Sequence, residues 1–343
     1  MSRIFLTGGT GMLGAHLLLD LTRNGTKVRA LKRRSSDLQW VRKIFSWYTP
    51  DAEKLFGNIE WVDGELMDKE SLREAMAGAD GVIHAAAKVS FDPGDREVVL
   101  KENIEGTANL VDLALELNIP RFCQVSSVAA LGNQDGGVAI NESFSWKNDR
   151  KRSAYSESKF QSEMEVWRGI EEGLQAIIVN PSVILGPGNW RNSSPRLFQT
   201  VFNGMKFYTS GGTGFVDVRD VSKAILLLLQ SDSWESVVNQ RFVLSAENLS
   251  YRDLFGKIAV ALHKPQPSLS ANHLLLQLGW RASWLVSAIT GKQPSLTRET
   301  ANSAGRTTLY DGSKITRTID FAYTPVDRTI QEIGKIFLDD VVS

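Results

Sequence analysis

A glycine-rich segment near the N-terminus constrains the fold of this chain more than any other feature. It reads TGGTGMLG over residues 7–14 and lies between the apolar run Ile4-Phe5-Leu6 and a helical pattern. Glycines at these spacings allow a sharp exit from a strand, close approach of a phosphate to the backbone, and close packing of helix on sheet. The helix N-terminus adds N–H donors and partial positive charge. The segment therefore predicts a turn that holds a dinucleotide pyrophosphate. The expected contacts are Thr7, Gly8, Gly11, Met12, Leu13 and Gly14.

Strand and helix patterns alternate through the first half of the chain. The predicted strands are residues 3–6, 27–31, 59–62, 81–85, 121–125 and 175–179, and the predicted helices are residues 12–24, 38–48, 69–77, 95–117 and 153–172. Such alternation favours parallel strands, right-handed crossovers and helices on both sheet faces. Apolar runs such as residues 176–179 are typical of buried parallel strands. The sequence therefore predicts an α/β fold, a Rossmann-type doubly wound parallel sheet.

The regular alternation weakens after Asn180-Pro181, where glycine and proline signals multiply. We therefore expect a dinucleotide-binding domain over residues 1–181 and a smaller C-terminal lobe, mainly substrate-binding, over residues 182–343. Residues 214–231 are expected to return to the first domain as a strand and a helix. An aromatic-rich segment over residues 40–56 either reshapes a rim of the site or packs on the core. Residues 274–289 are predicted to form an amphipathic helix of the second lobe.

Bulk composition excludes several classes of protein. Lys plus Arg and Asp plus Glu both number 39, so no global charge favours nucleic acid or an acidic membrane. The single cysteine, Cys123, cannot form an intramolecular disulfide, which fits a reducing compartment. The N-terminus enters a strand directly rather than resembling a signal peptide, and no run approaches 18 uncharged apolar residues. We therefore expect a cytoplasmic protein with no membrane span, no nucleic-acid partner and no metal site.

The residues after the second strand indicate which nicotinamide cofactor would bind. Enzymes that use NAD usually carry an acid there, which bonds the ribose hydroxyls. Here the segment reads Lys32-Arg33-Arg34-Ser35-Ser36, whose cations and hydroxyls suit a 2′-phosphate. The sequence thus predicts NADPH over NADH, with Arg33 as the favoured contact; the alternative is a solvated basic loop. Asp63, Glu65 and Leu66, after the third strand, are candidates for the adenine edge, unless the two acids are simply solvated.

Carbonyl chemistry is indicated by Tyr155 and Lys159, which the predicted helix places at i and i+4 on one face. A free phenol has a pKa of about 10, too high for easy proton exchange at neutral pH, and a nearby cation lowers it. Lys159 could also bond the nicotinamide ribose. Ser127, beside Ser126 after the fifth strand, could hold the substrate oxygen. Against this, Y-x-x-x-K occurs by chance in many surface helices, and Ser127 could be a simple capping hydroxyl.

Taken together, these motifs resemble those of the extended short-chain dehydrogenase/reductase family, within the NAD-dependent epimerase/dehydratase superfamily. The resemblance is strongest to the branch of dihydroflavonol-4-reductase and 3β-hydroxysteroid dehydrogenase. It rests on residues 7–14, His84-Ala85-Ala86-Ala87, Asn103-Ile104-Glu105-Gly106-Thr107, Ser126-Ser127, Tyr155 with Lys159, Asn180-Pro181-Ser182 and residues 215–221.

The resemblance implies roles for particular residues. Ser127, Tyr155 and Lys159 match the catalytic triad. Ala85, Ala86, Ala87 and Ser126 would line the nicotinamide side of the cofactor, and Asn180, Pro181 and Val183 would touch its carboxamide end. Asn103 matches a family motif position and is counted among the cofactor contacts. Val89, with Ser127 and Tyr155, would contact the substrate.

Three functions remain open from the sequence. The leading hypothesis is NADPH-dependent reduction of a ketone or aldehyde on a small, apolar or ring-containing substrate. The second is an NAD-dependent nucleotide-sugar epimerase or dehydratase, with Arg191, Arg196 and Arg219 available for a sugar diphosphate. The third is a protein that binds NADPH without chemistry. A monomer and a homodimer are both open, since helices 95–117 and 153–172 pair across the dimer in many relatives.

Overall fold

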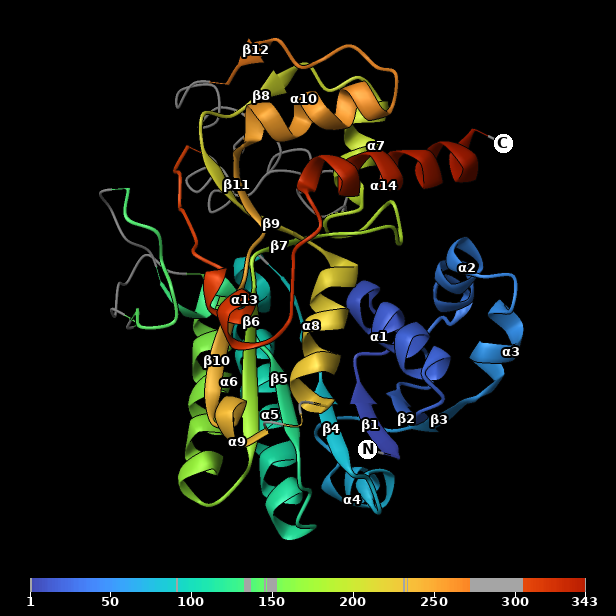
Figure 1. The fold of residues 1–343 in the computed structure, drawn as a ribbon, viewed down its shortest axis with the longest axis vertical. Helices are drawn as coiled ribbons and strands as arrows, with labels where there is room; N and C mark the ends of the chain where they lie inside the picture. Colours follow the sequence, from blue (N-terminus) through green and yellow to red (C-terminus); the bar gives the residue numbers. More distant parts are fainter. Residues whose placement is uncertain are drawn as a thin grey trace.

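The larger part of the protein is built around a seven-stranded, fully parallel sheet (Figure 1). The computed structural model describes residues 2–90, 92–132, 137–144, 146, 153–230, 232, 234–271 and 305–342. The sheet order is β10-β6-β5-β4-β1-β2-β3, which confirms the doubly wound parallel sheet. The strands are β1 (Arg3–Thr7), β2 (Lys27–Lys32), β3 (Ile59–Asp63), β4 (Gly81–His84), β5 (Phe122–Val125), β6 (Ala176–Pro181) and β10 (Gln240–Leu244).

Helices bury both faces of this sheet. In β1, Ile4 and Leu6 enter one apolar core while Phe5 enters the other, as the alternation of side chains along a strand requires. The first core is closed by α1 (Met12–Arg23), α2 (Gln39–Tyr48), α3 (Ala52–Gly57) and α8 (Val218–Gln230). The second is closed by α4 (Lys69–Met76), α5 (Arg96–Glu116) and α6 (Ala154–Glu171).

A second lobe lies beyond the carboxyl ends of the parallel strands, at the top of Figure 1. It contains a three-stranded sheet of β7 (Val183–Leu185), β9 (Gly212–Asp217) and β11 (Glu247–Ser250), and a pair of β8 (Phe207–Tyr208) and β12 (Leu269–Ser270). Its apolar core gathers Phe198, Leu254 and Phe337. These come from α7 (Arg196–Phe202), α10 (Tyr251–Ala261) and α14 (Val326–Val341). The helix expected over residues 274–289 lies outside the described residues.

The chain crosses between the two parts more often than the expected division at residue 181 implies. Helix α8 returns to the first core, as residues 214–231 were expected to do, but β9 pairs with β7 and β11 instead of the large sheet. After the short α9 (Trp234–Val237), β10 adds a seventh strand beside β6, with α13 (Ser313–Thr318) packed on it. Strand β10 was not anticipated, because five residues after an irregular segment carry little periodic signal.

The aromatic-rich segment after β2 forms α2 and α3 and packs on the core. Val41, Ile44 and Phe45 are buried in the core that also holds α1. Trp47 contacts Trp190 of the second lobe, with ring centroids 5.6 Å apart. Of the two expectations for this segment, the structure supports packing on the core.

The structure describes the cysteine and the groups that could span a membrane or bind a metal. Cys123 is fully buried in β5, and burial raises the pKa of its thiol, which makes it a packing residue. No helix within the described ranges combines the length and apolar character needed to cross a membrane. Over the same ranges, no three metal-ligating side chains gather into a cluster.

Phe242→Ala tests whether β10 belongs to the main core. The Phe242 side chain is fully buried in the core of the large sheet. Its loss should lower the free energy of unfolding by about 3–5 kcal/mol, as for other buried aromatics. Urea unfolding measures this, with the exposed Val260→Ala as control, expected to change stability by less than about 0.5 kcal/mol. Equal effects of the two substitutions would contradict this placement of β10.

Candidate active site

The glycine-rich turn joins β1 to α1 in the geometry that its sequence predicts. Gly8 has φ of 78°, and a Cβ on it would lie 2.5 Å from the Ala86 nitrogen. The Gly11 nitrogen donates to the Gly8 oxygen at 3.0 Å, and a Cβ on Gly14 would lie only 2.0 Å from that same oxygen. Gly11 is also the N-cap of α1 and has no side chain to bond the first turn. The glycines therefore leave room for a close ligand at this turn, the glycine cradle, and the N-terminus of α1 offers N–H donors that suit an anion.

A buried hydrogen-bond chain fixes this turn to the next strand and to α5. The Thr7 hydroxyl lies 2.7 Å from His84 Nδ1, and His84 Nε2 lies 3.1 Å from Thr107 Oγ1, which itself donates to the Asn103 oxygen at 2.7 Å. That last bond assigns the proton of the imidazole to Nε2, so Nδ1 accepts from Thr7. Burial lowers the pKa of His84 to about 3, which keeps it neutral. The carboxyl ends of β1 and β4 are thus held in register.

Asn103 clamps the loop that follows β4. Its Oδ1 accepts from the Lys88 nitrogen at 2.7 Å, and its Nδ2 donates to the Lys88 oxygen and to Ser158 Oγ, both at 3.0 Å. The amide therefore bonds three protein groups, and its expected contribution to cofactor binding would act through the position of this loop. The loop and the turn present half-buried residues of the expected cofactor set. These are Met12, Leu13, Ala85, Ala86 and Ala87.

The structure brings Ser127, Tyr155 and Lys159 together where β5 ends and α6 begins. Ser153 caps α6 by accepting from the Ser156 nitrogen at 2.9 Å, which sets where the helix starts. The Ser127 hydroxyl bonds that of Tyr155. Lys159 Nζ donates to the Val125 oxygen at 3.0 Å. The i, i+4 spacing places Tyr155 and Lys159 on the same face of α6, as predicted.

Burial dominates the proton affinities of the pair. It raises the pKa of Tyr155, and the hydrogen bond with Ser127 opposes that rise. It lowers the pKa of Lys159 to about 8, and the negative charge of Glu163 opposes that fall. The lowering of the Tyr155 pKa by Lys159, expected from their spacing, is absent in this arrangement.

Asn180 connects the end of β6 to both β5 and α6. Its Nδ2 donates to the Ser127 oxygen at 3.1 Å and to Glu163 Oε1. Its Oδ1 is buried and has no hydrogen-bond partner among the described residues. An unpaired buried acceptor is costly, so this oxygen suits an amide donor such as a carboxamide. Pro181 is buried and Val183 half-buried beyond it, and Ser126 is buried at the end of β5.

The basic residues after β2 divide into a bound lysine and two exposed arginines. Lys32 forms an ion pair with Asp63, the last residue of β3. The Arg33 side chain is 64% exposed, and its Nη2 lies 3.3 Å from Glu102 Oε2, which leaves most of the guanidinium accessible. Arg34 is exposed. Two guanidinium groups are therefore available to an anion at this end of the site, while Lys32 is largely neutralised.

The expected adenine contacts lie after β3. Glu65 is exposed, and Leu66 is half-buried with its oxygen accepting from Asn109 Nδ2 at 2.8 Å. A Cβ on Gly106 of α5 would lie 2.9 Å from Leu66 Cβ, so the glycine makes room for this leucine. Of the two candidate acids, Asp63 is occupied by Lys32 and Glu65 is the accessible one.

Two charged residues at the site were missed by the sequence analysis. Glu163, fully buried, follows Lys159 by one helical turn, and Arg241 of β10 lies beside it, with Nη1 3.5 Å from Glu163 Oε2. A signal for Glu163 existed, because residues 155, 159 and 163 recur every four positions on one helix face. No local signal exists for Arg241, since it depends on a strand pairing distant in sequence.

The residues at the carboxyl ends of these strands fit a dinucleotide. The glycine cradle, the donors of α1 and the unpaired Asn180 Oδ1 lie along one edge of the sheet, where ligands of open α/β sheets bind. Residues 4–239 match the NAD dependent epimerase/dehydratase family. The chain belongs to this family. With its reductase and dehydrogenase relatives, that membership makes it an extended short-chain dehydrogenase/reductase, an NAD(P)-dependent oxidoreductase class.

Two named relatives align with most of this chain. A Synechocystis sp. protein named "Putative dihydroflavonol 4-reductase" is 29% identical over 96% of this chain and 92% of its own length. "Sterol demethylase protein B" of Methylococcus capsulatus is 29% identical over 79% of this chain and 78% of its own. Among solved structures, gox2253 superposes with TM-score 0.79 and 26% identity, covering 99% of both chains. The UDP-glucose 4-epimerase of Thermus thermophilus, in complex with NAD, has TM-score 0.75 and 18% identity, covering 99% of this chain and 100% of that one.

Gly14→Ala tests the cradle. A methyl group 2.0 Å from the Gly8 oxygen forces the turn apart, which should cost about 1–3 kcal/mol of unfolding free energy. Affinity for a nicotinamide dinucleotide, measured by fluorescence titration, should fall by about tenfold or more if the same turn holds the phosphates. Gly57→Ala is the matched control, because a Cβ there meets nothing within 4 Å. Unchanged affinity in Gly14→Ala would exclude this turn as the nucleotide site.

Proposed function

We propose that the protein reduces a ketone or aldehyde carbonyl of a small apolar or ring-containing molecule with NADPH. The observation that carries this proposal is the hydrogen-bonded Ser127–Tyr155 pair, with Lys159 one helical turn further along the same face of α6. A carbonyl oxygen that approaches both hydroxyls would accept two hydrogen bonds as negative charge develops on it. The glycine cradle and the end of β6 flank this point on the same sheet edge.

Each member of the triad has a distinct role in this proposal. Bound NADPH would supply the hydride to the carbonyl carbon. Tyr155 would give its phenolic proton to the oxygen, and Ser127 would orient and polarise that oxygen. Lys159 would hold the ribose and stabilise the phenolate that the departing proton leaves behind. Burial raises the pKa of Tyr155, and the hydrogen bond with Ser127 opposes that rise and so favours release of the proton.

The choice of NADPH rests on the end of β2. The residue after that strand is Arg33, where NAD enzymes usually have an acid for the ribose hydroxyls. Its guanidinium and that of Arg34 are exposed and can bind a 2′-phosphate through paired N–H donors. Glu102 holds Arg33 only at 3.3 Å, so a phosphate can replace it.

The arginines considered for a sugar diphosphate give less support to the alternative function, a nucleotide-sugar epimerase or dehydratase. Arg219, one of three arginines considered for a sugar diphosphate, is bound to Asp217 and to Glu332. Arg191 and Arg196 are exposed. The solved relatives that carry such names are 16–21% identical, a level that speaks for the fold alone.

We further propose that the second lobe and the loop after β4 bind the substrate, while the large sheet binds the cofactor. Val89 of that loop is 55% exposed, and Val183 begins the first strand of the second lobe. Both are apolar, which suits a hydrophobic carbonyl compound. Trp190 of the second lobe is buried in the apolar core of that lobe.

Tyr155→Phe tests the chemistry. It removes the proton donor and keeps the ring, so kcat should fall by about 10²- to 10⁴-fold while the dissociation constant for NADPH stays within about twofold. Stopped-flow measurement of NADPH oxidation with a panel of ketones and aldehydes checks the rate. Tyr48→Phe, in α2 on the core of the large sheet, is the control. Turnover at the wild-type rate in Tyr155→Phe would exclude the mechanism.

Arg33→Ala tests the cofactor preference. Loss of a charge-assisted hydrogen bond of about 1.5–3 kcal/mol should weaken NADPH binding by roughly 10- to 150-fold and leave NADH binding nearly unchanged. Arg317→Ala, an exposed arginine of α13, should affect neither cofactor. Fluorescence titration of both nucleotides measures the ratio, and co-purification of tightly held NAD would speak for the epimerase reading instead.

A further inference from the structure

A buried carboxylate lies one helical turn beyond Lys159. Glu163 is fully buried on the face of α6 that meets the sheet. Asn180 donates to its Oε1, and Arg241 Nη1 lies 3.5 Å from its Oε2. Burying a charge is costly unless opposite charge and hydrogen bonds compensate it. The two cations that interact with Glu163 are Arg241 and Lys159, so its negative charge acts on the lysine of the triad.

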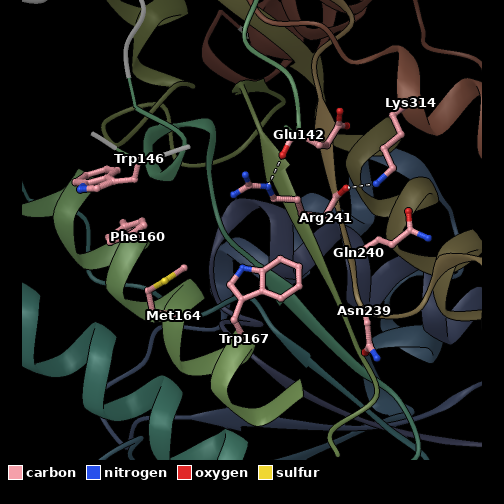
Figure 2. Close-up of a pocket in the computed structure, with 9 residues that line it drawn as sticks. All are labelled: Glu142, Trp146, Phe160, Met164, Trp167, Asn239, Gln240, Arg241 and Lys314. Carbon is pink, nitrogen blue, oxygen red and sulfur yellow. Dashed lines mark hydrogen bonds between the residues drawn. The ribbon is translucent and has the colours of Figure 1, made fainter. Parts of the chain in front are cut away.

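Arg241 is itself rigidly held. Its Nε donates to the Glu142 oxygen at 2.8 Å and its Nη2 to the Phe144 oxygen at 2.7 Å, while its own oxygen accepts from Lys314 Nζ at 2.8 Å (Figure 2). Its orientation therefore does not depend on the carboxylate that it faces. Glu163 meets a preformed cation.

The outer side of Arg241 lines a pocket of about 590 Å³ on the solvent side of α6 (Figure 2). Phe160, Met164 and Trp167 of α6 line it as well, and Trp146 stacks on Phe160 with centroids 4.4 Å apart. Arg241 thus lines this pocket and also faces Glu163. A substitution of Arg241 therefore alters the charge next to Glu163 while the three triad residues stay unchanged.

The charges alternate from β10 to the triad: Arg241, Glu163, Lys159. Burial raises the pKa of the Glu163 carboxyl, and hydrogen bonds with Ser126 and Asn180 together with the cations of Arg241 and Lys159 oppose that rise. Around Lys159, burial lowers the pKa of the ammonium and Glu163 raises it. The remaining titratable neighbours are His84, which is neutral, and Tyr155. Glu163 is the one acid that acts on Lys159 among these groups.

We propose that Glu163, braced by Asn180 and Arg241, is a positioning residue that keeps Lys159 protonated and in place beside Tyr155. The proposal rests on the proposed function, because it assumes that the Lys159 ammonium takes part in catalysis. It adds a buried acid and a distant arginine to the triad, each acting through Lys159 rather than on the substrate.

The expected pH dependence has a definite sign. An activity that needs the Lys159 ammonium is lost as the pH rises through the pKa of Lys159. Glu163→Gln removes the negative charge but keeps an oxygen for Asn180, so that pKa falls and the basic limb of the rate profile moves to lower pH, by about one unit. Arg241→Gln removes the cation next to Glu163, raises the pKa of its carboxyl, and should move the acidic limb to higher pH.

The experiment measures kcat against pH with NADPH and the best carbonyl compound of the panel. Glu165→Gln, the same change two residues on, where Glu165 pairs with Arg168, is the matched control and should retain the wild-type profile. Arg241→Lys keeps the charge and should restore the acidic limb. A loss in Glu163→Gln that is equal at every pH would indicate a merely structural role and overturn the proposal, as would an unshifted basic limb.

A second measurement does not depend on turnover. The titration of Lys159, followed by NMR of ¹³C-labelled lysine and assigned with Lys159→Met, should shift to lower pH in Glu163→Gln. An unshifted titration overturns this inference even where Tyr155→Phe is inactive, whereas full turnover of Tyr155→Phe overturns the proposed function whatever Lys159 does. If Glu163→Gln does not fold, the comparison of Arg241→Gln with Arg241→Lys decides, and identical acidic limbs count against the proposal.

Discussion

The burial of polar side chains at the carboxyl ends of β1, β4, β5 and β6 is the constraint on which the rest of the site depends. Parallel strands end at one edge, and the polar side chains buried there are stabilised by hydrogen-bond partners inside the protein. Thr7, His84 and Thr107 satisfy one another across three elements, and a neutral imidazole with a fixed tautomer results. The turn proposed to hold the phosphates is therefore positioned by a hydrogen-bond chain among Thr7, His84 and Thr107.

Helix α6 likewise brings the proposed catalytic groups into contact with the polar groups of the sheet edge. Its buried face carries a phenol, an ammonium and a carboxylate at successive turns, and the sheet edge supplies the Val125 oxygen, the Ser127 hydroxyl and the Asn180 amide to meet them. Because Lys159, Glu163 and Asn180 are buried, a change in the charge of a neighbour acts strongly on them. The site is thus better described as one polar network between α6 and three strands than as three isolated residues.

Features set by residues close in sequence could be predicted, whereas features set by contacts between distant segments could not. The glycine turn, the strands of the large sheet up to β6 and the Tyr155–Lys159 pair are local patterns, and the structure reproduces them within one or two residues at most ends. Arg241 and β10 could not be predicted, because a five-residue strand gains its place only from pairing with β6. The Lys32–Asp63 pair likewise follows from strand register, which leaves Arg33 and Arg34 as the accessible cations. The buried His84 had a local motif, but its bonds to Thr7 and Thr107 needed three elements in place.

The opposite effects of burial on the two catalytic groups bear on the direction of the chemistry. Desolvation disfavours the charged form of each, so it raises the pKa of the phenol and lowers that of the ammonium. A phenol that keeps its proton is ready to protonate a carbonyl oxygen, while phenolate formation is opposed until positive charge lies nearby. Lys159 can supply that charge only if it stays protonated against its own desolvation, and Glu163 is placed to oppose that loss. In the proposed reductase, the acid behind the lysine therefore supports the charge on which the role of the lysine depends.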